Sequence, residues 1–181
     1  MPNWCSNKVT FAHSDHLQIK RVADAFNRGE LFAEFKPCPE ELIETEASPG
    51  VESEQRSNNV TKYGHSDWYE WCLANWGTKW DVSGDDEVDI DDGEKVVNLC
   101  FDTAWSPPIA FYQAMEDLGF KVDAFYYEPG VGFCGRYSMG DDEYFEILGD
   151  AEWVEKNIPV EIDDAFSIAE CMSDWEEDQE E

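Results

Sequence analysis

Acids are the residues in this sequence with the clearest chemical potential, and they gather in two places. The chain holds 42 Asp and Glu against 12 Lys and Arg, which gives a formal net charge of -30 at pH 7. Carboxylates at this density attract cationic surfaces and speed association with them. The predicted partner-binding residues are therefore the acids of two clusters, Asp85, Asp86, Glu87, Asp89, Asp91 and Asp92, and then Asp141, Asp142 and Glu143.

A second group of residues could form a pocket rather than a surface. Lys79 is one of few bases and lies in a tryptophan-rich stretch, and Asp102 ends a predicted central strand. Two plainer roles stay open, since Lys79 could pair with a neighbouring acid, and Asp102 or Ser106 could cap the next helix. The alternative pocket is predicted to contain Trp76, Lys79, Asp102 and Trp105.

Metal, cofactor and nucleophile chemistry is not indicated by the residues present. His13 and His16 are close in sequence to Cys5, but a zinc site needs about four converging ligands and the chain has only 3 His. Six widely spaced cysteines without a CxxC pair are typical of buried free thiols. We expect no metal, no cofactor and no catalytic residue, so a non-enzymatic protein is favoured.

The charge also excludes classes of partner. Proteins that bind DNA or RNA directly need a cationic face, and an anionic membrane surface is disfavoured for the same reason. The sequence has no apolar run long enough for a transmembrane helix, and its beginning lacks a cationic segment followed by an apolar one. A cytoplasmic location in the host cell is therefore expected.

Periodicity and turn residues predict the elements that must position these groups. The segment 45–62, rich in Ser, Glu and Asn, is predicted to be a mobile insert. Helices are predicted from Ser14 or Asp15 to Gly29, over 67–75, and from Pro107 to Gly119. Strands are predicted at 4–11, 86–90, 95–102, 120–127, 133–138 and 143–148.

The order strand, helix, strand, strand, helix, strand predicts an α+β fold. The expected architecture is a ferredoxin-like split βαβ antiparallel sheet with helices on one face. A helical insertion at about 30–77 follows the first helix, and an extra hairpin ends the domain. We expect one domain over residues 1–150 and an acidic extension over 151–181 that is partly helical or frayed.

Four stretches in this order resemble a known family. They are Met1–Asn7 (MPNWCSN), Asn75–Asp81 (NWGTKWD), Phe101–Pro108 (FDTAWSPP), and Glu128–Gly130 followed by Phe133–Gly135. Together they resemble the YubB-type ferredoxin-like family of bacteriophages and conjugative plasmids. The resemblance implies the fold and a mobile-element origin, and it implies no catalytic or binding residues. The two acidic clusters lie outside these motifs.

Three explanations compete for the charge: a solvated surface that aids solubility, salt adaptation, and a decoy for a basic nucleic-acid site. The favoured hypothesis is a non-enzymatic acidic binding protein that occludes a basic site on a host nucleic-acid-binding or defence protein. The alternative is a small-ligand-binding protein or enzyme that uses the tryptophan-rich pocket between the sheet and the insertion. The partner's identity and the oligomeric state stay open.

Overall fold

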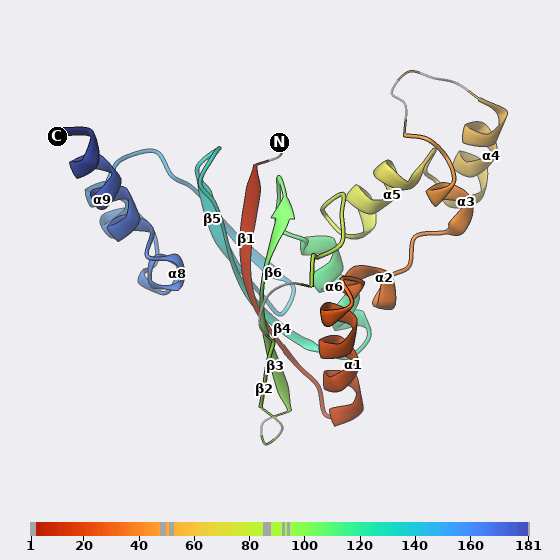
Figure 1. The fold of residues 1–181 in the computed structure, drawn as a ribbon, viewed down its shortest axis with the longest axis horizontal. Helices are drawn as coiled ribbons and strands as arrows, with labels where there is room; N and C mark the ends of the chain where they lie inside the picture. The colour runs from red at the N-terminus through yellow and green to blue at the C-terminus, as the bar shows by residue number, and fades with distance from the viewer. Residues whose placement is uncertain are drawn as a thin grey trace.

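A six-stranded antiparallel sheet is the centre of this α+β protein, and helices pack on both of its faces (Figure 1). The computed structural model describes residues 3–47, 50, 53–84, 88–91, 93 and 95–180. The strands lie in the order β2-β3-β1-β4-β5-β6. Their bounds are β1 Trp4–Ala12, β2 Val88–Asp91, β3 Val96–Ala104, β4 Lys121–Glu128, β5 Phe133–Ser138 and β6 Asp141–Glu146.

The helices fall into two groups, six before β4 and three at the end of the described chain. The first group is α1 His16–Asn27, α2 Leu31–Phe35, α3 Glu40–Ile43, α4 Glu54–Tyr63, α5 Trp68–Asn75 and α6 Ile109–Asp117. The second group is α7 Ala151–Asn157, α8 Val160–Phe166 and α9 Ile168–Glu180. Within the described ranges, no helix combines the length and the apolar character needed to cross a membrane.

The main core lies between the sheet and the first helix group. Alternate residues of β1, among them Val9 and Phe11, point to this side because side chains alternate along a strand. They pack with Ile19 and Val22 of α1 and with Phe111 of α6. Asp15 begins α1 by accepting a hydrogen bond from the Leu17 backbone N–H at 2.9 Å, as its residue type predicts.

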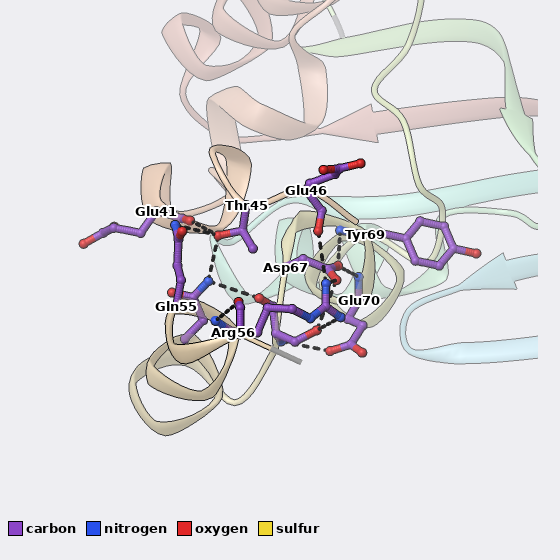
Figure 2. Close-up of polar contacts among 11 residues, drawn as sticks. Glu41, Thr45, Glu46, Gln55, Arg56, Asp67, Tyr69 and Glu70 are labelled. Atoms are coloured by element: carbon purple, nitrogen blue, oxygen red, sulfur yellow. Dashed lines mark hydrogen bonds and ion pairs between the residues drawn. The ribbon is translucent and has the colours of Figure 1, made fainter. Parts of the chain in front are cut away.

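A largely buried polar network links the helices of the insertion, which lies between α1 and β2, to one another, as Figure 2 shows. Arg56 of α4 forms an ion pair with Asp67 at 2.7 Å, and the two side chains are 13% and 4% exposed. Arg56 also donates to the Ser66 hydroxyl at 2.7 Å, and Asn59 donates to the Thr45 hydroxyl at 2.9 Å. The network therefore joins the end of α3, the helix α4 and the start of α5.

The prediction of a mobile insert at 45–62 is wrong for its second half, and residues 48, 49, 51 and 52 of this segment lie outside the described residues. Residues Glu54–Tyr63 form α4, which begins at Ser53, whose hydroxyl accepts from the Arg56 backbone N–H at 3.2 Å. The helix has little apolar surface, and its one buried residue is Asn59. Polar contacts rather than an apolar stripe hold it, so hydrophobic periodicity gave no signal.

The C-terminal helices cover part of the sheet face opposite to α1 and α6. Val154 of α7, Ile162 of α8 and Ile168 of α9 form a second, smaller core with Cys134 of β5. Helices thus lie on both faces rather than on one, and residues 151–180 are largely helical, with Val154, Ile162 and Ile168 packed against the sheet. The sequence signal was weak because the apolar residues are divided among short helices, and α7 and α8, at 7 residues each, are too short to display a clear helical period.

Candidate functional site

The register of the strands brings residues of both acidic clusters to one face of the sheet. Residues directly opposite in antiparallel strands point to the same side. Pairing from β2 to β6 therefore sets six side chains in one line across the sheet. We call it the polar row: Asp89, Asn98, Thr10, Asp123, Ser138 and Asp141.

Hydrogen bonds order most of the polar row. The Asn98 amide donates to the Asp89 carboxylate at 3.1 Å, and the Thr10 hydroxyl donates to the Asn98 amide oxygen at 2.7 Å. Arg136 donates to both carboxylate oxygens of Asp123, at 3.3 and 2.9 Å. Hydrogen bonds therefore hold the carboxylates of Asp89 and Asp123 in position. The three acids of the row are separated by about 14 and about 10 Å at the usual strand spacing.

The structure brings together four of the nine predicted partner-binding acids on this face. Asp91 shares the side chain direction of Asp89, and Glu143 lies opposite Arg136 on the same side as Asp141. Asp142 points to the other face, where it accepts a hydrogen bond from the Tyr126 hydroxyl at 2.8 Å. The remaining four, Asp85, Asp86, Glu87 and Asp92, lie outside the described residues.

The C-terminal helices leave part of this face open. A groove of about 640 Å³ runs over β1, β3 and β4 up to α8. Lys8 and Arg136 are its cations, and Asp123 and Glu161 are its acids. The groove is lined by Lys8, Val9, Thr10, Asn98, Leu99, Cys100, Asp123, Phe125, Arg136 and Glu161. We call this groove together with the polar row the open sheet face.

A second concave site lies on the other side of the molecule, between the insertion and the loop after α5. It has a volume of about 380 Å³ and mostly apolar walls. Trp76 is buried and its indole N–H donates to the Lys36 carbonyl at 2.8 Å, while Trp80 is 43% exposed. The lining residues of this tryptophan cavity are Ala33, Pro37, Cys38, Ile43, Trp68, Cys72, Trp76, Lys79, Trp80 and Asp81.

Lys79 supplies the cation of the tryptophan cavity. Its ammonium lies 3.7 Å from the centre of the Trp80 ring, a cation–π contact. Within the part of the chain that the structure describes, no carboxylate lies at salt-bridge distance from it. The prediction that Lys79 pairs with a neighbouring acid therefore does not hold among these residues.

The remaining polar groups of the tryptophan cavity are neutral or already bonded. Burial raises the pKa of the Cys72 thiol to about 12, and burial also raises the pKa of Cys38. The carboxylate of Asp81 accepts backbone N–H bonds from Phe32, Ala33 and Val82, each at 2.9 Å. Burial nevertheless raises the pKa of Asp81, because desolvation disfavours its charged form.

Only half of the predicted alternative pocket belongs to this cavity. Trp76 and Lys79 line it, whereas Asp102 lines a neighbouring cleft of about 360 Å³. Trp105 is half exposed and lines neither. Trp80 and Asp81 line both hollows and were missed, although they end the stretch Asn75–Asp81 that the sequence singles out.

The expected capping role of Asp102 is wrong. Its carboxylate accepts a hydrogen bond from the Ser6 hydroxyl at 2.8 Å, across the pair of strands β1 and β3. The Ser106 hydroxyl donates to the Gly77 carbonyl at 2.7 Å, and α6 begins after Pro108 without a side-chain cap. Backbone carbonyls take the place of a cap: the Ile109 N–H donates to the Pro107 carbonyl at 2.9 Å and the Phe111 N–H donates to the Trp76 carbonyl at 3.2 Å.

Metal ligands do not cluster in the described ranges, where no group of three or more His, Cys, Asp or Glu could hold an ion. His13 instead lies against the Phe120 ring, with the ring centres 4.8 Å apart. Cys5 is buried, and burial raises its pKa well above the ordinary value. The described cysteines are free thiols, of which Cys100 and Cys171 are exposed.

Comparison with known proteins leaves the family of this chain open. No family model matches the sequence, and no curated protein matches it. The fold is similar to the crystal structure of the protein api92 from Yersinia pseudotuberculosis, which carries the family label DUF1281. That similarity has a TM-score of 0.44 and 12% sequence identity, and it covers 82% of this chain and 99% of the other.

Proposed function

We propose that the chain is a non-enzymatic acidic binding protein of a phage or plasmid, which occludes a basic site on a host nucleic-acid-binding or defence protein. The open sheet face is the proposed interface. The observation that carries the proposal is the polar row, where Asp89 and Asp141 from opposite edges of the sheet face the same way. Carboxylates spaced along a surface can imitate a track of phosphates for a cationic cleft.

The proposed scaffold is the ferredoxin-like split βαβ. Four strands in the order β2-β3-β1-β4 support it, with α1 after β1 and α6 after β3. The hairpin of β5 and β6 extends the sheet beyond β4. In this arrangement the insertion occupies the helical side, so the opposite face is available for a partner wherever α7–α9 do not cover it.

Charge reversal on the open sheet face tests the proposal. The double variant Asp89→Lys/Asp141→Lys changes two exposed acids of the polar row. The matched control, Asp24→Lys/Asp117→Lys, makes the same charge change at exposed positions of α1 and α6. Each protein is used to capture partners from host lysate at low salt, and the captured protein is then tested for release of a labelled DNA or RNA duplex.

The expected result is that the wild type and the control capture a basic partner and displace the duplex in stoichiometric amounts. The polar-row variant loses capture, because a contact between opposite charges becomes a repulsion. Capture that survives the polar-row reversal, or a captured partner that keeps its duplex, contradicts the proposal. Loss of capture by both variants would show that net charge alone matters, which also contradicts a defined interface.

A second candidate function rests on the tryptophan cavity. Its volume of about 380 Å³ falls in the range of small-molecule sites. Its walls are mostly apolar and carry one unpaired cation among the described residues, Lys79. A small-ligand-binding protein is therefore the alternative, and a ligand that raises the unfolding temperature would support it.

A further inference from the structure

The size and the walls of the tryptophan cavity favour a flat apolar group. A cavity of about 150 Å³ is enough for a benzene ring. The tryptophan cavity, at about 380 Å³, has room for two fused rings. Trp68, Trp76 and Trp80 line it, and indole rings stack on other rings by face or edge.

The polar groups in the walls disfavour a nucleobase. A base brings several donors and acceptors that need partners when they leave water. The thiols of Cys38 and Cys72 are neutral, because burial raises the pKa of both. A neutral thiol is only a weak hydrogen-bond donor and acceptor. Asp81 already accepts three backbone N–H bonds. A ring without polar edges therefore loses less on entering this cavity.

Lys79 favours a ligand whose flat ring carries a negatively charged group. Its ammonium lies against Trp80 at the cavity, and no described acid neutralises it. One ammonium suits one carboxylate, and a bond between two charged groups is stronger than one between neutral groups. A diphosphate would need further cations, and Lys79 is the one basic side chain in the described lining.

We propose that the tryptophan cavity binds a small monocarboxylic acid that carries a flat apolar ring. The ring lies among Trp68, Trp76 and Trp80, and the carboxylate accepts a hydrogen bond from Lys79 Nζ. This inference rests on the second candidate function and adds the chemical class of the ligand.

Calorimetric titration of the full chain with naphthylacetate and with its neutral amide, naphthylacetamide, tests the inference. The wild type should bind the acid about tenfold more tightly than the amide. Lys79→Gln should abolish this preference, and Lys79→Arg should keep it because the charge remains. The matched control is Lys121→Gln, which removes an exposed cation of β4 outside the cavity and should leave the preference unchanged.

A variant that fills the cavity locates the binding. Ala33→Leu adds side-chain volume to the lining and should weaken both compounds, with the unfolding midpoint of each variant checked against the wild type. In the nitrogen-proton spectrum the indole signals of the lining tryptophans should shift on titration. Equal binding of acid and amide by the wild type would overturn the ligand class and leave the cavity function standing. Absence of binding by both compounds would overturn the inference and count against the second candidate function as well.

Discussion

The two faces of the sheet are built by different means. On the side of α1 and α6, aromatic and aliphatic residues form the main core, and a buried ion pair fastens the insertion. On the other side, the smaller core beneath α7–α9 covers only part of the strands, and the rest presents the polar row. The first side can be expected to supply most of the stability, because buried apolar area supplies the main driving force for folding.

The difference also separates the two candidate sites. The tryptophan cavity lies at the surface of the helical side, and its walls combine the buried Trp76 with exposed side chains such as Trp80. The open sheet face is defined by strand register and by hydrogen bonds between polar side chains, such as Thr10 to Asn98. A ligand in the cavity would contact mainly apolar surface, whereas a partner on the open face would meet charge.

The largest expected effect is the loss of the buried ion pair in the insertion. Asp67→Ala leaves the Arg56 guanidinium buried without its partner and removes the cap of α5, which Asp67 forms with the backbone N–H groups of Tyr69 and Glu70. We expect a loss of about 3–5 kcal/mol in the free energy of unfolding, measured by urea denaturation.

The matched control is Lys62→Gln, which breaks the exposed ion pair with Glu41. Its denaturation midpoint should equal that of the wild type, because exposed pairs contribute little. If both variants lose the same stability, the network of Figure 2 is not the element that fastens the insertion.

The next prediction compares the stability lost when an isoleucine is changed to alanine in each of the two cores. Ile19 and Ile162 are each 1% exposed, one in the main core and one beneath the C-terminal helices. Each change to Ala should cost about 2–5 kcal/mol, because it deletes buried methyl and methylene groups. Hydrogen exchange should show lost protection across the sheet for Ile19→Ala, but only within α7–α9 for Ile162→Ala.

Global loss of protection in Ile162→Ala would show that the two cores unfold as one unit. It would then be wrong to treat the C-terminal helices as a separate covering of the sheet. The far-ultraviolet spectrum of each variant checks that the sheet is still formed before exchange begins.

The smallest expected effect is that of salt. The net charge of -30 makes the folded chain repel itself, and salt screens such repulsion over about 10 Å at 0.1 M. Raising sodium chloride to roughly 0.5 M should raise the melting temperature by about 3 °C, which corresponds to roughly 1 kcal/mol. Asp89→Asn/Asp141→Asn should reduce this slope, and an unchanged slope would show that the polar row carries no unusual repulsion.

The predicted elements were found where local signals are strong. The strand β1, the helices α1 and α6, and the hairpin of β2 and β3 lie close to their predicted ranges. Alternation, helix caps and turn residues act over a few neighbouring positions, so one sequence displays them. The helix α4 was missed because its buried residue is polar, and α7–α9 were underestimated because α7 and α8 are too short, at 7 residues each, to display a helical period.

The candidate sites were predicted less completely than the elements. Trp76 and Lys79 do line one cavity, but Asp102 belongs to the neighbouring cleft and Trp105 to neither. Membership of a cavity depends on segments that are distant along the chain, such as the residues around Ala33 and those around Trp80. A sequence pattern within one short stretch therefore cannot predict which distant segments line the same cavity.

The amino-acid sequence by itself determined the charge, the two acidic clusters and most of the strands. Only the tertiary structure decided which of these acids lie on the same face of the sheet. Strand register sends Asp141 and Glu143 to the open sheet face and turns Asp142 toward Tyr126 on the other side. Side chains alternate along a strand, so a shift of one residue in the pairing would exchange these roles. Register is a property of the folded sheet, and for that reason the sequence could name the acids but not choose among them.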